Sequence, residues 1–192
     1  IEAAIHALGK ISDERALVSL VNLIEAGEAQ WEGTICRALI EIGKTHPSAT
    51  SEAIRDSIHR QGIRPIWLRV IGGLARDNEL DVLIAAAGHL DSEIRRAAIA
   101  AAVIYGSRFP ENLLIGSLQD ESPKIRAKAA AALGAYASDS TIAALETAIG
   151  DSDALVVAKA VSSLSMSGGK MVLPTILHSL EHSASPVVIA SL

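Results

Sequence analysis

Cationic side chains gather in one segment of the sequence, residues 55–69 (RDSIHRQGIRPIWLR). Four arginines there face a single aspartate, a local balance of +3, in a chain whose formal net charge is −5. Guanidinium groups bind carboxylates and phosphates through paired hydrogen bonds, and a tryptophan ring offers a flat apolar surface for stacking. The segment therefore predicts a partner-binding patch for an acidic protein or peptide, made of Arg55, His59, Arg60, Arg64 and Trp67.

A second interpretation of the same segment stays open. Clusters of surface charge often have no binding role, and arginines of this kind can be solvated or paired with neighbouring carboxylates. Trp67 would then pack between structural units instead of facing a partner. Sequence alone leaves both interpretations standing.

Other reactive residue types give no catalytic constellation. The single cysteine, Cys36, lies in a helix-like segment and is expected to be a small buried hydrophobe, and one cysteine permits no intramolecular disulfide. His178 and His182 are spaced i, i+4, which could present two imidazoles on one helix face, but a solvated helix end is the interpretation we favour. The glycines and lysine of MSGGKMVLP lack the frame of a phosphate loop. We therefore predict no catalytic residue, metal or cofactor.

Composition narrows the fold and the partners. The chain has 192 residues, of which 49% are hydrophobic, 3% aromatic and 20% charged. A core of Ala, Leu, Ile and Val with so few aromatic residues favours closely packed helices over a β-sandwich. The negative charge argues against a protein that grips nucleic-acid phosphates. No apolar run approaches the roughly 18 residues that span a bilayer, so no membrane span is expected.

An internal repeat organises the whole chain. Similar helix ends recur at residues 9, 43, 75, 103, 134 and 165, which gives a period of about 31 residues. Small or apolar residues recur at fixed distances before each of these helix-end positions, namely nine, five, four and one residues. The column five residues before contains Ala4, Ala38, Val70, Ala98, Ala129 and Ala160. These spacings put one apolar stripe on each helix, with a small residue where a neighbouring helix approaches closely.

Each repeat contains a second helix after the first. Predicted second helices include residues 13–26, 51–60, 79–90, 111–118, 140–149 and 170–180. Aspartates and serines at residues 13–14, 91–93, 139–140 and 151–153 supply capping oxygens at helix starts. Two helices per repeat, stacked in register, predict an all-α fold: an α-solenoid of about six stacked helix pairs.

The repeat also resembles a known family. The motif DESPKIRAKAAAALG (residues 120–134), echoed at residues 91–101 and 151–164, resembles the short HEAT-like repeats first described in phycobilin lyases, within the armadillo/HEAT superfamily. The resemblance implies a right-handed α-solenoid with second helices on its concave side. It covers residues 1–192 as a single HEAT-like domain, and the cut repeats at both ends predict an excerpt of a longer chain.

The function expected from this architecture is non-enzymatic. Solenoids offer wide, shallow surfaces that suit recognition, so we predict a protein–protein interaction scaffold that holds a protein or peptide partner on its concave face. The alternative is a phycobilin lyase-type subunit acting on a tetrapyrrole and a carrier protein. Nucleic-acid processing is disfavoured by charge. Partner identity, oligomeric state and compartment are left open.

Overall fold

The computed structural model describes residues 1–167, and this part of the chain consists of helices and turns without a strand. Its α-helices are α1 (Glu2–Ile11), α2 (Ala16–Glu25), α3 (Glu32–Thr45), α4 (Pro47–Gln61), α5 (Pro65–Leu74), α6 (Leu80–Ala87), α7 (Ser92–Tyr105), α8 (Glu111–Ser117), α9 (Pro123–Leu133), α10 (Asp139–Ala148) and α11 (Ala154–Ser167). Short 3-10 turns precede α3 and α6 and follow α7. The predicted all-α fold is confirmed.

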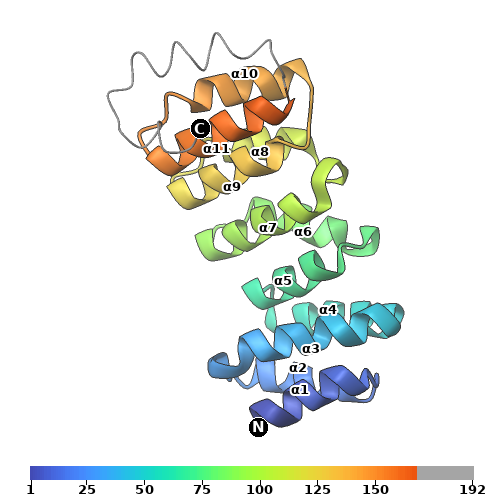
Figure 1. Ribbon diagram of the computed structural model, residues 1–192. Coiled ribbons are helices and arrows are strands. Elements are labelled where there is room, and N and C mark those ends of the chain that lie inside the picture. Colours follow the sequence, from blue (N-terminus) through green and yellow to red (C-terminus); the bar gives the residue numbers. More distant parts are fainter. Residues whose placement is uncertain (168–192) are drawn as a thin grey trace.

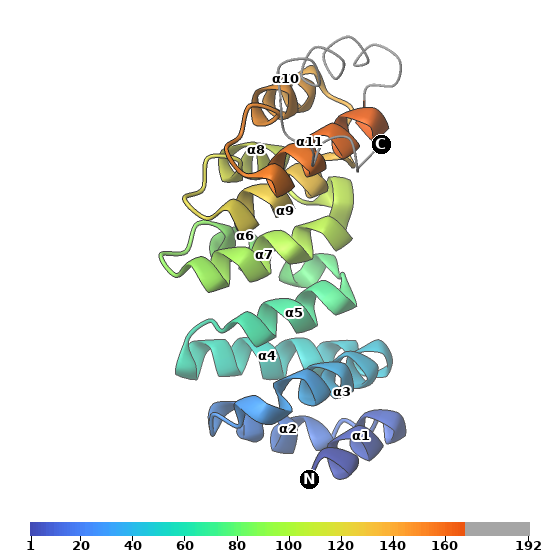
Figure 2. The ribbon, with the colours of Figure 1, turned by 60° about the vertical axis from the view of Figure 1, so that its left-hand side comes forward.

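The helices form two layers that run along the stack. The first helices of the repeats pack in succession, α1 on α3, then α5, α7, α9 and α11, and Figures 1 and 2 show this order from the N-terminal end to α11. The second helices α2, α4, α6, α8 and α10 each pack against a first helix. The predicted helical solenoid of stacked pairs is therefore confirmed over residues 1–167. The predicted second helix at residues 170–180 lies outside the described residues, and the right-handed sense stays a prediction.

The predicted columns form the core of the stack. Five residues before the helix ends, Ala98, Ala129 and Ala160 have 0% exposed surface, and Ala38 has 3%. These small side chains let adjacent first helices approach closely, because a larger group at the same position would meet the neighbouring helix. Ala4, in the same column of α1, is exposed, since no first helix of the described chain packs on that side.

Ion pairs link successive repeats near the starts of their first helices. Nε of Arg95 lies 2.7 Å from Oδ2 of Asp120, and Nε of Arg126 lies 2.7 Å from Oδ2 of Asp151. Both arginines also donate to main-chain carbonyls at the start of their own repeat. The two pairs are related by 31 residues, one period of the repeat. Hydrogen bonds from Arg126 hold the pKa of Asp151 below its ordinary value.

Candidate functional site

The predicted patch lies at the C-terminal end of α4 and in the turn to α5. Arg55 forms an ion pair with Asp81 on α6, with 2.9 Å between Nη2 and Oδ1, and also donates to the carbonyl of Asn78. Arg60 lies 2.8 Å from Oε1 of Glu25 on α2. Each of these arginines therefore has an acidic partner on a neighbouring second helix.

Arg64 turns inward from the loop before α5. Its Nη1 donates to the carbonyl of Ile24 at 2.5 Å, near the end of α2, and its Nη2 lies 3.6 Å from Glu32. The same carboxylate also accepts from Arg69 at 2.6 Å. These contacts satisfy main-chain carbonyls and carboxylates of the preceding repeat, so a partner would compete with them for Arg64.

The two ring side chains of the predicted patch lie in different environments. Trp67 has 0% exposed surface and packs in the core of the stack, where a partner cannot stack on it. His59 is exposed on α4. The structure thus brings His59 and Arg60 together on the surface, ties Arg55 and Arg64 into contacts between repeats, and separates Trp67 from all four. Their role in binding stays a prediction.

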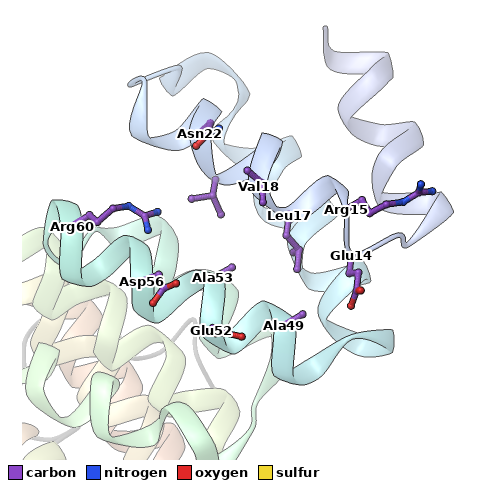
Figure 3. Close-up of a pocket in the computed structure, with 11 residues that line it drawn as sticks. Glu14, Arg15, Leu17, Val18, Asn22, Ala49, Glu52, Ala53, Asp56 and Arg60 are labelled. Carbon is purple, nitrogen blue, oxygen red and sulfur yellow. The ribbon is translucent and has the colours of Figure 1, made fainter.

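Arg60 also lines a groove of about 610 Å³ between α2 and α4. Figure 3 shows Arg60 at one end of this groove and Glu14 with Arg15 at the other. Acidic Glu52 and Asp56 stand along the α4 wall beside Arg60. Glu25, the ion-pair partner of Arg60, has a lowered pKa. The larger cause is a hydrogen bond from Ser57, and the next is the hydrogen bond from Arg60. The groove is therefore mixed in charge and does not form a cationic pocket.

A second groove, missed by the sequence analysis, crosses the first helices of three repeats. It encloses about 710 Å³, and we call it the lysine groove. Its lining comes from α7, α9 and α11 and consists of Glu93, Arg96, Val103, Lys124, Ala127, Lys128, Ala131, Leu155 and Lys159. Among these residues, Val103 and Leu155 are 46% and 53% exposed.

The three lysines of this groove differ from the arginines described above. Within residues 1–167, Lys124, Lys128 and Lys159 have no hydrogen-bond partner and no ion pair, although Lys124 lies close enough to Glu93 to help to lower the pKa of that carboxyl. The larger cause of the lowered pKa of Glu93 is the hydrogen bond from Arg96 on the same helix, with 2.5 Å between the paired atoms.

A sequence signal for the lysine groove does exist. Lys128 and Lys159 are 31 residues apart, and each stands six residues before the helix-end position of its repeat. Arg37 and Arg69 occupy the same column in earlier repeats. A search for columns of charged residues, in place of a local count of charge, would have found it.

The remaining reactive residues give no further site in the described part of the chain. Cys36 is buried, and burial raises the pKa of its thiol. Residues 1–167 contain no group of three or more potential metal ligands. His178 and His182 lie outside the described residues. In the same range, no helix has both the length and the apolar character needed to cross a membrane.

Comparison with known proteins agrees with this architecture. The family model of HEAT repeats matches residues 110–192. The predicted resemblance is thereby confirmed, and the same paired helices continue through the stack toward residue 1. HEAT repeats form helical scaffolds suited to protein interaction.

The other comparisons add little. Fourteen chains of solved structures match. One of them is the crystal structure of an engineered protein, 19% identical, with a TM-score of 0.46, in which the alignment covers 99% of this chain and 86% of that chain. No curated protein matches the sequence.

Proposed function

We propose that this chain is a binding scaffold whose lysine groove holds a segment of a partner protein. The observation that carries the proposal is the exposed apolar surface along that groove. Val103 on α7 and Leu155 on α11 are about half exposed, although their neighbours Ala102 and Val156 in the same helices are fully buried. Apolar side chains beside a groove are typical of surfaces that bind protein, because burial against a partner removes them from water.

The groove suits binding better than catalysis. It is lined mainly by alanines, aliphatic side chains and lysines, and it is open along three repeats. A protein segment laid across α7, α9 and α11 would cover Val103 and Leu155 together. Burial of apolar surface contributes roughly 25 cal/mol per Å² before the cost of ordering the partner is counted.

The test compares protein capture by matched variants. We expect Val103→Gln with Leu155→Gln to lose the proteins that the wild-type chain captures from a cell extract, as identified by mass spectrometry. The control is Ile11→Gln with Leu90→Gln, which changes two aliphatic side chains that are 69% and 97% exposed elsewhere. Equal capture by both double variants would contradict the proposal.

The exposed end of α4 is a second surface that we propose for an acidic partner. The Arg60 side chain is 52% exposed, and His59 beside it is exposed as well. Substitution of Arg64 would also break its bond to the carbonyl of Ile24, so the sharper variant is His59→Asn with Arg60→Gln. Weaker partner capture at low salt, with an unchanged thermal melt, would support this surface. Unchanged capture would exclude it.

A further inference from the structure

The lysine groove carries positive charge in addition to its exposed apolar surface. Three of the six lysines in the sequence line it, in a chain with net charge −5. Lys124 and Lys128 stand one helical turn apart on α9, and Lys159 stands on α11. A partner that supplies carboxylates would pair with charges that have no ion pair within residues 1–167, and would form charge-assisted hydrogen bonds with them.

Arg96 on α7, the third helix of the groove, can bind a partner carboxylate together with these lysines. Arg96 on α7 pairs with Glu93, and the two side chains are 34% and 61% exposed. Exposed pairs of this kind contribute at most about 1 kcal/mol, so Arg96 can be shared with a partner carboxylate. The groove thus presents four cations on three successive first helices, one on α7, two on α9 and one on α11.

The spacing of these cations selects a conformation of the partner. Lys128 and Lys159 are one period of 31 residues apart on helices that pack against each other. Packed helices lie about 8–10 Å apart. A polyproline II segment has three residues per turn and rises about 3.1 Å per residue, so every third side chain points the same way and recurs about every 9 Å. Its step matches the step between repeats.

We propose that the lysine groove binds an acidic segment of a partner protein in polyproline II conformation, with a carboxylate at every third residue. This proposal rests on the proposed function, since it names the chemistry of the segment that the groove holds. Successive carboxylates meet Arg96, Lys128 and Lys159, while Lys124 adds charge beside Lys128. The residues between the carboxylates cover the alanines and the exposed Val103 and Leu155.

Fluorescence anisotropy with synthetic peptides tests the proposal on the full chain. The probe is a labelled 15-residue peptide of five Glu-Pro-Pro units, which places a carboxylate at every third position. One comparison peptide has the same composition with glutamates alternately two and four residues apart, and another has Gln in place of Glu. We expect the first peptide to bind at least tenfold more tightly than both others, and salt to weaken its binding.

Matched variants assign the binding to the groove. Lys124→Gln, Lys128→Gln and Lys159→Gln together should weaken binding of the Glu-Pro-Pro peptide at least tenfold. The control combines Lys10→Gln, Arg37→Gln and Lys44→Gln, which removes the same charge from α1 and α3 and should change the affinity less than twofold. Circular-dichroism melts of both triple variants confirm that they are folded.

Three outcomes would overturn the proposal. These are equal binding of the two glutamate peptides, equal effects of the two triple variants, and tighter binding of a 15-nucleotide oligothymidylate than of the Glu-Pro-Pro peptide. If the peptides fail but Val103→Gln with Leu155→Gln still loses the captured proteins, the acidic segment is wrong and the proposed scaffold stands. If neither the peptides nor that double variant shows an effect, both proposals fail.

Discussion

At the scale of single residues, arginine and lysine have separate tasks in this chain. Arg55, Arg95 and Arg126 each pair with a carboxylate 25 or 26 residues ahead in the sequence, whereas Arg60 pairs with one 35 residues behind. A count of charge over fifteen residues finds the cluster at residues 55–69 but not these distant carboxylates, because they come from neighbouring repeats. The planar guanidinium suits such bidentate links, whereas the three lysines of the lysine groove have no ion pair within residues 1–167.

The link between Arg126 and Asp151 gives a prediction about stability and its pH dependence. The two side chains are 16% and 12% exposed, and Arg126→Met leaves Asp151 without its charged partner. We expect a loss of about 2–3 kcal/mol in the free energy of unfolding at neutral pH, measured in urea. Arg96→Met, which breaks an exposed pair within one helix, should cost no more than about 0.5 kcal/mol.

The sign of the pH dependence follows from the lowered pKa of Asp151 in the folded chain. An unfolded aspartate has a pKa of about 3.9, so the pair stabilises the fold above that pH, and its contribution is lost as pH falls through the lower folded pKa. The difference between wild type and Arg126→Met should therefore shrink below about pH 4. A difference that stays constant down to pH 2 would show that the ion pair is not its source.

At the scale of helices, the sequence columns predicted the packing surface well. Ile66, Ala98, Ala129 and Val161, taken from the columns nine, five and four residues before the helix ends, are all buried. Their positions follow from helical periodicity alone, which is why they could be predicted. The column that contains Lys128 and Lys159 could be read in the same way, but the sequence could not show that these cations lack a partner once the repeats are stacked.

Substitution by alanine should have opposite effects on stability at two glycines, because only one of them lies where two first helices approach closely. A Cβ atom on Gly72 of α5 would lie 2.8 Å from Cβ and 3.2 Å from Cα of Ala101 on α7, so one of the helices must shift. We expect Gly72→Ala to cost about 1–3 kcal/mol in urea unfolding.

The matched control is Gly33→Ala, near the start of α3. A Cβ there meets nothing within 4 Å, and alanine favours the helical backbone. It should stabilise the chain by up to about 0.5–1 kcal/mol. Destabilisation of similar size by both substitutions would mean that close helix approach at Gly72 is not what alanine disturbs.

At the scale of the whole molecule, the main helix contacts within residues 1–167 join helices of the same repeat or of adjacent repeats. α7 packs on α5, α6 and α9, whereas α1 packs on α3. In such a stack, the free energy of unfolding is close to the sum of one contribution from each repeat and one from each interface between adjacent repeats. A terminal helix therefore opens at a lower free energy than a central one.

Hydrogen exchange followed by mass spectrometry should show this gradient. We expect the amides of α1 to exchange faster than those of α7, because fewer contacts must break to expose them. The measurement is repeated at tenfold lower protein concentration, which separates the free chain from an associated one. Equal protection of α1 and α7 at both concentrations would contradict the nearest-neighbour description.

The links from Arg95 to Asp120 and from Arg126 to Asp151 have a mechanical consequence. Each of these ion pairs joins one repeat to the next and does not reach a third repeat. A small rotation of one repeat against its neighbour is therefore not opposed by these links at other interfaces. Small rotations at successive interfaces between repeats therefore add up along the axis of the stack. A ligand that clamped three adjacent repeats would stiffen that length of the stack and leave the other repeats compliant.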